Sequence, residues 1–437
     1  MSEFKFDHPS IVFDDIDFIS THNGSLYDSC YIPGQIGDSD TEYITFSGGG
    51  MAGAAFAGVL KDMELRCLYQ PKRSILADTW TFDPIDPFYG ANRPIKNWLG
   101  SSAGAICATF AALGAPADYI IDQLVNTDAR MFLDYGGRDQ LNSGWSWWNK
   151  LLNYRYGITD LLSKWGMVRG NKFREWFSNQ MIRLGWSPST DFNDLYNLTG
   201  QRLVITATSL NTFETLYLSR SSYPYMAILD AVDATMRLPW LFPPIYMNDP
   251  LIPQGKRILT DGGILNNLPI NACDVTSNTG EILAINRKAV GFTLVTDGKW
   301  VPDYIHIDGL LKYSLTFVQS MHTRMHVLQS SQAHFWDRVV PIETHGIGTT
   351  DFEVDKVKLR RTIESGQKAS KRFFDQRAEM ISTYGPLPRN LFIPNCRLRY
   401  KGVEYLSDDL IENAMIYQTN PSKFMWNKLP IERCFSC

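Results

Sequence analysis

The sequence predicts an α/β fold, in which helices cover both faces of a central sheet. Two observations predict it. Short β-rich runs alternate with stretches of helical length and periodicity, the runs being "EYITF", "IKNWL", "QRLVITATSL" and "EILAIN". In two places such a run passes through a glycine-containing turn directly into a helix rich in small residues, which allow close packing on a sheet.

The composition is that of a globular protein that does not bind nucleic acid. The chain has 437 residues, of which 44% are hydrophobic, and a net charge of −4, so it can bury one large core or two smaller ones. No block of Lys or Arg supplies the basic stripe expected of a nucleic-acid-binding surface. Seven scattered cysteines without CxxC spacing predict neither a disulfide framework nor a zinc site, so we expect no metal and no cofactor.

The first 41 residues read as a polar N-terminal arm. The N-terminus carries acids where a signal peptide would carry basic residues, and no later apolar run approaches the roughly 20 residues that a membrane span needs. We therefore expect a cytoplasmic or intracellular protein that meets membranes only at their surface.

The first strand is expected at Tyr43 to Phe46, and a glycine cluster, residues 48–53 (GGGMAG), follows it. The cluster formally matches the dinucleotide-binding pattern G-x-G-x-x-G, but the acid expected about 20 residues further on would fall near "LYQPKR", which has no carboxylate. A plain tight turn is a second interpretation. An oxyanion hole is the third, because glycines let backbone N–H groups approach a carbonyl oxygen unobstructed. Two glycine-lined turns after neighbouring parallel strands would meet at one edge of the sheet, which favours the third interpretation.

The second strand–turn–helix unit, residues 97–110 (NWLGSSAGAICATF), contains a G-x-S-x-G motif with Ser102 at its centre and Gly100 and Gly104 at its ends. In a nucleophile elbow the serine lies on a strained turn, and the flanking glycines avoid collisions with neighbouring strands. The N-terminal N–H groups of the following helix favour developing negative charge at this point. An ordinary strand–helix turn is the alternative.

Further along the chain, helical patterns dominate. Residues 118–190 are rich in tryptophan and predict a helical cap-like insertion. Trp145, Trp147 and Trp148 either dock at a membrane interface, where indole rings partition favourably, or pack over the core. After residue 300, amphipathic helices are expected at 310–332 and 356–380.

A nucleophilic serine needs a base, and the chain offers two kinds of candidate. A Ser-His-Asp hydrolase would use one of the downstream histidines, which are His306, His322, His326, His334 and His345. Three of these lie in a polar helical pattern, and none lies in a glycine-flanked loop. By contrast, "RILTDGGILNNLPI" places Asp261 at a strand end, before Gly262 and Gly263. A simple Asp-Gly-Gly turn is the alternative, but beside the other motifs Asp261 is the best available base.

These motifs, in this order, resemble the patatin-like phospholipases. The supporting stretches are "DATMRLPWLFPPI", "GNKFREWF" and "TIESGQKASKRFF", and the resemblance covers residues 42–375. It implies a three-layer sandwich with a mostly parallel sheet, and it leaves residues 376–437 as a C-terminal extension. It also implies that Ser102 is the nucleophile, that Asp261 is the general base, and that the oxyanion hole comes from Gly48, Gly49, Gly50 and Gly53.

The resemblance implies a lipid acyl hydrolase of the phospholipase A or lysophospholipase type, acting on phospholipid or other acyl-lipid esters. Aspartate is a weak base at its usual pKa of about 4, so we expect an apolar cleft that raises this pKa. Two departures from the family pattern, Ala52 in place of a basic residue and Arg237 in place of a small one, bear on lipid preference. The alternative function is a catalytically silent lipid- or protein-binding member of the same fold.

Overall fold

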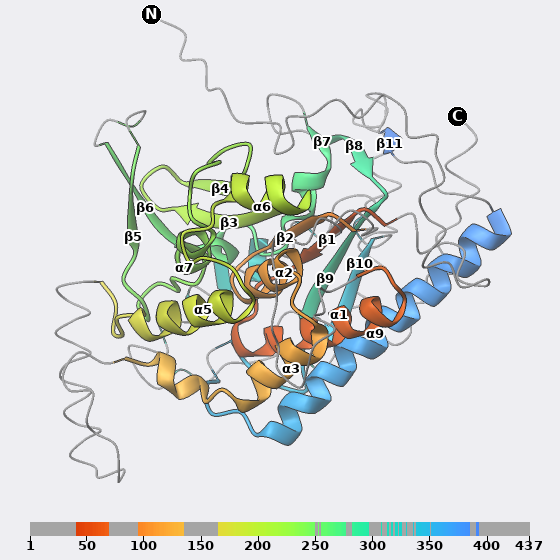
Figure 1. Ribbon diagram of the computed structural model, residues 1–437, viewed down its shortest axis with the longest axis horizontal. Coiled ribbons are helices and arrows are strands. Elements are labelled where there is room, and N and C mark those ends of the chain that lie inside the picture. The colour runs from red at the N-terminus through yellow and green to blue at the C-terminus, as the bar shows by residue number, and fades with distance from the viewer. Residues whose placement is uncertain are drawn as a thin grey trace, which may run out of the picture.

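The computed structural model describes residues 41–69, 95–134, 165–249, 252, 255–276, 282–296, 338–349, 351–384 and 390–392, with single residues between 307 and 335. Within these residues, an eight-stranded sheet forms the centre of the molecule (Figure 1). Its strands are β1 (Tyr43–Phe46), β2 (Asn97–Gly100), β3 (Arg202–Ser209), β4 (Glu214–Ser219), β5 (Ile245–Asn248), β6 (Lys256–Asp261), β9 (Ala289–Val295) and β10 (Val339–Glu343).

Seven α-helices and several 3-10 turns accompany the sheet in the described part of the chain. The α-helices are α1 (Ala55–Leu65), α2 (Ala103–Leu113), α3 (Ala117–Asn126), α5 (Asn171–Arg183), α6 (Phe192–Thr199), α7 (Ile228–Thr235) and α9 (Lys356–Tyr384). The 3-10 turns are η3 (Gly50–Ala54), η4 (Ala129–Phe132), η5 (Gly262–Ile264) and η6 (Pro269–Cys273).

The strand order is β10-β9-β1-β2-β3-β6-β5, and β4 also pairs with β3. The five strands from β10 to β3 are parallel, whereas β4, β5 and β6 are joined by antiparallel pairings. The predicted α/β fold with a mostly parallel sheet is therefore confirmed. The run "EILAIN" does form a strand, β8 (Ile282–Asn286), but the expectation that it joins the main sheet is wrong. It pairs with β7 (Val275–Thr276) and β11 (Asn390–Phe392), and β9 takes the place beside β1.

Strand β3 holds β2 and β6 end to end along one of its edges. Ile205 pairs with both Gly100 of β2 and Leu218 of β4, so these two strands lie on opposite edges of β3. Ala207 pairs with both Leu216 of β4 and Asp261 of β6, so β6 lies on the same edge as β2. Because β6 runs antiparallel to β3, the carboxyl ends of β2 and β6 face each other across Thr206.

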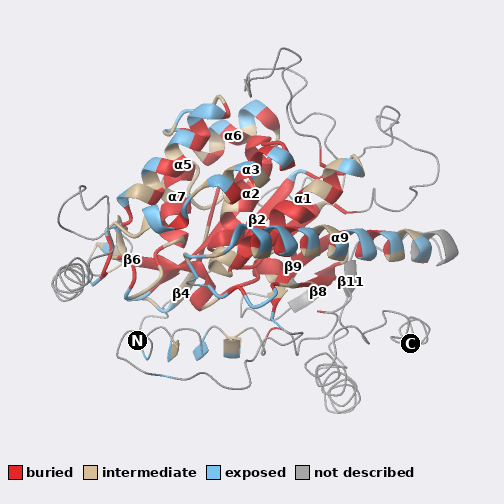
Figure 2. Cartoon of the chain, turned by 90° about the horizontal axis from the view of Figure 1, so that it is seen from below, coloured by how far each residue is buried: buried red, intermediate tan, exposed pale blue. Residues whose placement is uncertain are grey.

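The sheet separates two apolar cores. Along β1 the side chains alternate, as a pleated strand requires: Ile44 and Phe46 belong to the larger core, and Tyr43 to the smaller one. Helices α1, α2, α5, α7 and α9 contribute buried residues to the larger core, and they turn their buried sides toward the sheet (Figure 2). The smaller core includes Leu268 and Ile270, at the start of η6, and Phe335.

Helix α9 closes the larger core by packing along α1. Gly58 and Gly366 make this close approach possible, since a Cβ on either would lie within 2 Å of a carbonyl oxygen of the other helix, at 1.8 and 1.9 Å respectively. The helix runs without interruption to Tyr384, so the domain boundary expected at residue 375 falls inside it.

The expected cap, residues 118–190, is described in part. Its helices α3 and α5 contribute buried residues to the larger core, while Trp145, Trp147 and Trp148 lie outside the described residues. The amphipathic helix expected at 356–380 is confirmed as α9, whereas most of the one expected at 310–332 lies outside the described residues. No helix in the described ranges combines the length and apolar character needed to cross a membrane.

Candidate active site

Ser102 lies on a strained turn between β2 and α2. Its φ of 50° and ψ of −125° are unusual for a residue with a side chain. The turn is compact because α2 leaves β2 directly beside β1. A Cβ on Gly104 would lie 2.4 Å from the carbonyl oxygen of Ser47 and 2.5 Å from that of Phe46, so only glycine fits there. This is the geometry of a nucleophile elbow.

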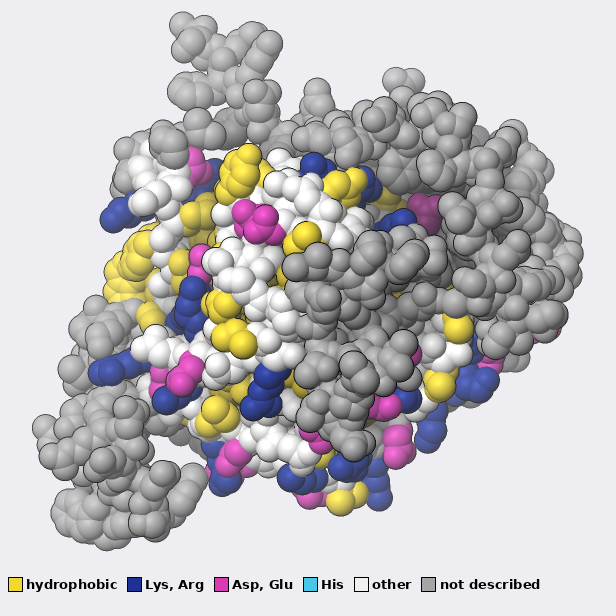
Figure 3. Space-filling view, in the orientation of Figure 1, with side chains coloured by type: hydrophobic (Ala, Val, Ile, Leu, Met, Phe, Trp, Pro, Cys, Tyr) yellow, Lys and Arg dark blue, Asp and Glu magenta, His cyan; other side chains and the backbone are white. Residues whose placement is uncertain are grey.

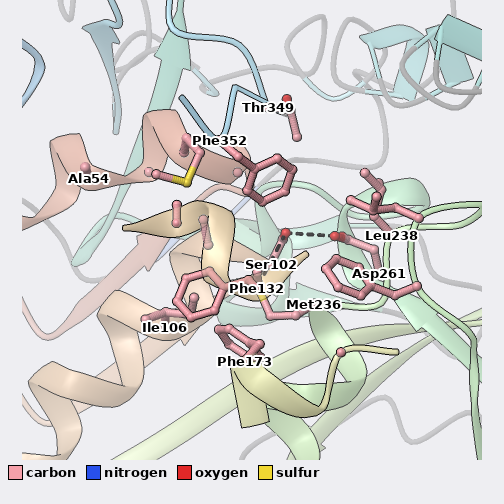
Figure 4. Close-up of a pocket in the computed structure, with 18 of the residues that line it drawn as sticks. Ala54, Ser102, Ile106, Phe132, Phe173, Met236, Leu238, Asp261, Thr349 and Phe352 are labelled. Carbon is pink, nitrogen blue, oxygen red and sulfur yellow. Dashed lines mark hydrogen bonds between the residues drawn. The ribbon is translucent and has the colours of Figure 1, made fainter. Parts of the chain in front are cut away.

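The structure distinguishes the two adjacent serines. Ser101 is fully buried, and its hydroxyl has no hydrogen-bond partner among the described residues. The Ser102 hydroxyl donates a 2.7 Å hydrogen bond to Oδ2 of Asp261, and the two groups point toward each other at the edge of a cavity (Figure 4). The backbone N–H of Ser102 donates to Oγ1 of Thr235 at 2.8 Å, which holds the elbow against the end of α7.

Asp261 is the last residue of β6 and reaches Ser102 because β6 and β2 end opposite each other. Its other carboxylate oxygen, Oδ1, accepts a 2.7 Å hydrogen bond from the backbone N–H of Gly263. Gly262 lets the chain turn closely against β3, since a Cβ there would lie 2.3 Å from the carbonyl oxygen of Thr206. The two glycines after Asp261 thus have different tasks, one steric and one as a donor.

Burial raises the pKa of Asp261 from its usual 3.8 to about 6, and the hydrogen bonds from Ser102 and Gly263 oppose this rise. Asp261 as a whole is 6% exposed. At neutral pH the group is therefore mainly ionised, but it holds a proton far more readily than an exposed aspartate does. A base of this strength is better matched to proton transfer near pH 7.

The structure separates the four glycines that the sequence grouped as one oxyanion hole. The N–H of Gly48 donates to the carbonyl oxygen of Asn267 at 3.0 Å, so it is already engaged. Gly53 lies inside η3, and a Cβ there would lie 2.5 Å from the Cβ of Ala103, which makes it a packing residue. The backbone N–H groups of Gly49 and Gly50 have no acceptor among the described residues. Of the four predicted oxyanion residues, Gly49 and Gly50 are therefore the ones whose N–H groups are free to donate.

One further free donor was not singled out from the sequence. Ala103 is the first residue of α2, and its N–H has no acceptor among the described residues. Helix starts leave such donors unpaired. Its position directly after the central serine of the motif was the available signal.

Ser102 and Asp261 border a largely apolar cavity of about 110 Å³. Its walls come mainly from three parts of the chain. These are the helical elements η3, α2, η4 and α5, the segment that follows α7, and the loop after β10 (Figure 4). The apolar lining includes Ile106, Phe132, Phe173, Trp176, Met236, Leu238, Leu241, Phe242 and Phe352. Such a lining suits a hydrocarbon chain and keeps water from the carboxylate.

A buried ion pair forms the polar part of the same wall. Arg237 donates to Asp233 at 2.7 Å and to the carbonyl oxygen of Arg169 at 2.8 Å. Asp233 also forms an ion pair with Arg174, at 3.3 Å. The sequence marked Arg237 as a departure from the family pattern, and the structure places it in the cavity wall, with its charge compensated.

The histidines give no sign of a triad where they are described. His345 is exposed, and its ring lies 2.8 Å from the hydroxyl of Ser365 on α9. His306, His322, His326 and His334 lie outside the described residues. Among the residues that the structure describes, no group of three or more His, Cys, Asp or Glu side chains is placed to hold a metal ion.

Comparisons with known proteins place these observations in a family. A family model described as patatin-like phospholipase matches residues 44–274. The uncharacterized protein R571 of Acanthamoeba polyphaga mimivirus is 24% identical over 345 residues, which is 78% of this chain and 95% of that protein.

A search of solved structures found two bacterial proteins among its matches. VipD from Legionella pneumophila has a TM-score of 0.44 and 15% identity, over 86% of this chain and 74% of VipD. The type III effector ExoU has a TM-score of 0.35 and 14% identity, over 87% of this chain and 61% of ExoU. The chain thus spans about three fifths of ExoU.

Proposed function

The chain belongs to the patatin-like phospholipase family, and from that premise we propose that it hydrolyses carboxylic esters of lipids with a Ser102–Asp261 dyad. The family acts on lipid substrates. The observation that carries the dyad is the 2.7 Å hydrogen bond from the Ser102 hydroxyl to Asp261, at the edge of an apolar cavity. A phospholipid or lysophospholipid is the substrate class that this cavity and this family favour.

In the first half-reaction, Asp261 accepts the hydroxyl proton of Ser102 while the serine oxygen bonds to the carbonyl carbon of the ester. The carbonyl electron pair moves to the oxygen and gives a tetrahedral oxyanion. When that intermediate collapses, the bond to the alcohol oxygen breaks, and the alcohol leaves with the proton held by Asp261. The acyl group then remains on Ser102.

In the second half-reaction, Asp261 accepts a proton from water while the water oxygen bonds to the acyl carbon. The second tetrahedral intermediate collapses, its bond to the serine oxygen breaks, and Ser102 recovers its proton from Asp261. The fatty acid is released and the dyad is restored. The same carboxylate therefore acts once as base and once as acid in each half-reaction.

We propose that the oxyanion is stabilised by the N–H groups of Gly49, Gly50 and Ala103. These amides have no acceptor among the described residues, and Gly50 and Ala103 line the cavity that Ser102 borders. Backbone donors that are already fixed in place cost no reorganisation when the negative charge develops.

We also propose that the catalytic domain extends beyond the family match, which ends at residue 274. Strands β9 and β10 complete the sheet on which the site is built, and β9 pairs directly with β1. Helix α9 covers α1. A domain of residues 42–384 therefore contains every described element of the main sheet.

A fluorophosphonate probe tests the proposal, because it labels only an activated serine. The wild type and Ser101→Ala should be labelled, and Ser102→Ala and Asp261→Asn should not. Hydrolysis of a short-chain ester should follow the same order, and the Ser102→Ala/Asp261→Asn double variant should be hardly worse than either single variant, since the two groups act as a unit. A folded wild type that neither reacts with the probe nor cleaves lipid esters would favour the catalytically silent binding protein.

A further inference from the structure

Three exposed aromatic side chains form a patch outside the cavity. Trp165, Trp240 and Tyr246, called here the aromatic patch, are 53%, 43% and 54% exposed. The rings of Trp165 and Tyr246 lie 6.3 Å apart. Trp240 pairs with Gly166, the residue after Trp165, in a parallel bridge. Hydrophobic side chains gather over β5 at the left edge of the molecule in Figure 3.

The backbone of the patch is strained at two of its three residues. Trp165 has a φ of 65° and Trp240 a φ of 70°, the left-handed region that bulky residues seldom adopt. Such a conformation costs roughly 1–2 kcal/mol per residue. Both tryptophans are nevertheless about half exposed, at 53% and 43% respectively. Strain of this kind concentrates at functional sites.

The patch is continuous with the cavity wall. Leu241 and Phe242 follow Trp240 directly, and both line the cavity beside Ser102. The N–H of Val168 donates to the carbonyl oxygen of Leu241 at 2.9 Å, so the chain after Trp165 runs beside the chain after Trp240. The segment from Trp240 to Phe242 thus presents an aromatic ring to the outside and two apolar side chains to the site, and the segment after Trp165 lies beside it.

We propose that the aromatic patch docks this protein on a lipid surface, so that an acyl ester can leave the surface and enter the cavity. Trp and Tyr rings favour the boundary between headgroups and acyl chains, where one part of the ring is apolar and another is wet. Exposed Asn248 and Lys256 form a cross-strand pair at the end of β5, next to Tyr246. The ammonium group of Lys256 is suited to a lipid phosphate.

A lipid surface fits better than a protein partner because the patch borders a cavity whose substrate class is itself assembled into such surfaces. The inference rests on the proposed function for this substrate class, but its binding step does not require the chemistry. Docking can therefore be measured in a protein that cannot turn over lipid.

The binding experiment uses Ser102→Ala protein and phosphatidylcholine vesicles in a sedimentation assay. Three further changes remove the patch: Trp165→Asn, Trp240→Asn and Tyr246→Thr. Asn tolerates the left-handed backbone and Thr suits a strand, so the fold should persist. We expect the partition coefficient to fall about tenfold or more, because the area of ring buried in the lipid is lost. Tyr225→Ser, which removes a tyrosine that is 82% exposed elsewhere, should leave the partition coefficient unchanged.

A kinetic experiment with Ser102 intact compares vesicles with a soluble short-chain ester. The ratio of vesicle hydrolysis to soluble-ester hydrolysis should fall about tenfold in the patch variant and stay constant in Tyr225→Ser. Vesicle binding by the patch variant equal to that of its parent would overturn the docking inference and leave the dyad standing. If vesicle binding were lost only in the patch variant, the result would support docking. If the wild type also hydrolysed neither substrate, that second result would refute the proposed chemistry.

Discussion

Raising the pH from 5 to 7 should increase ester hydrolysis by this protein about tenfold, because Asp261 acts only when it is ionised. Its pKa is raised by burial to about 6. The ionised fraction is then about 9% at pH 5 and about 91% at pH 7, so kcat/KM should rise through this interval and level off above it. An aspartate at the usual 3.8 would be more than about 90% ionised already at pH 5, and the profile would be nearly flat.

The assay measures initial rates on an uncharged, soluble ester well below KM, so that the profile reports the free enzyme. An imidazole base would make kcat/KM rise in the same pH range, since its ordinary pKa is about 6.5. Two controls distinguish a carboxylate base from an imidazole base. The carboxylate midpoint should hardly move with temperature, because carboxyl ionisation has a small enthalpy, whereas an imidazole midpoint should move clearly. The rise of kcat/KM with pH should also persist when each histidine is replaced by Gln, one at a time, at His306, His322, His326, His334 and His345.

A flat profile between pH 5 and 8 would refute the assignment of Asp261 as a buried base. The assignment would also be refuted if the rise of kcat/KM with pH disappeared when one histidine was replaced in a protein that still folds. The second result would return the site to a Ser-His-Asp arrangement.

The remaining predictions concern stability and the oxyanion loop. Folding raises the pKa of Asp261, so the stability it contributes is fully present below about pH 4 and is lost as the pH rises through about 6. Asp261→Asn should thus be more stable than the wild type above that pH, by up to about 3 kcal/mol for a pKa difference of about 2; denaturant titrations at pH 4.0 and 8.0 should show the advantage only at the higher pH. Gly49→Ala should cost little stability, because its Cβ would meet only the movable end of Leu294, at 2.2 Å, and it should lower kcat by at most about 10²–10³, the cost of one lost oxyanion donor, as this contact displaces the N–H of residue 49. Gly50→Ala should also lower the melting temperature, since its φ is +54° and its Cβ would lie 1.9 Å from a backbone oxygen; equal melting temperatures for the two variants would contradict this reasoning. Arg237→Met should destabilise by about 3 kcal/mol, because it leaves Asp233 buried without its closest partner, and Asp233→Leu in the same chain should recover much of the loss in denaturant titrations.

The two residues of the proposed dyad could be picked out from the sequence because each of them is set by a local pattern. The glycines around Ser102 require a tight elbow whatever surrounds it, and the two glycines after Asp261 mark a strand end that exposes a carboxylate. The parallel half of the sheet followed from strands that alternate with helices in the same way.

The distribution of roles within the glycine cluster could not be predicted, because distant segments decide it. Gly48 is engaged by Asn267, and Gly53 packs on Ala103, and neither partner is near in sequence. The ion pair of Arg237 with Asp233 follows helix spacing, but its burial in the cavity wall is a tertiary property.

The aromatic patch had no sequence signature either. Left-handed backbone is expected at glycine or asparagine, and nothing in the local sequence marks Trp165 and Trp240 as exceptions. The tryptophans that composition did single out, Trp145, Trp147 and Trp148, lie outside the described residues, so both interpretations of them, docking at a membrane interface and packing over the core, stay predictions.

The end-to-end placement of β2 and β6 on one edge of β3 determines where the chain tolerates a change of length. Gly100 and Asp261 are opposite Ile205 and Ala207, two positions apart on β3. A residue deleted within β6 would shift its pairing by one and turn the Asp261 side chain to the other face of the sheet, away from Ser102. A residue added between β5 and β6 leaves that pairing intact, so an affinity tag or an inserted domain belongs in such a connection and never inside the strand.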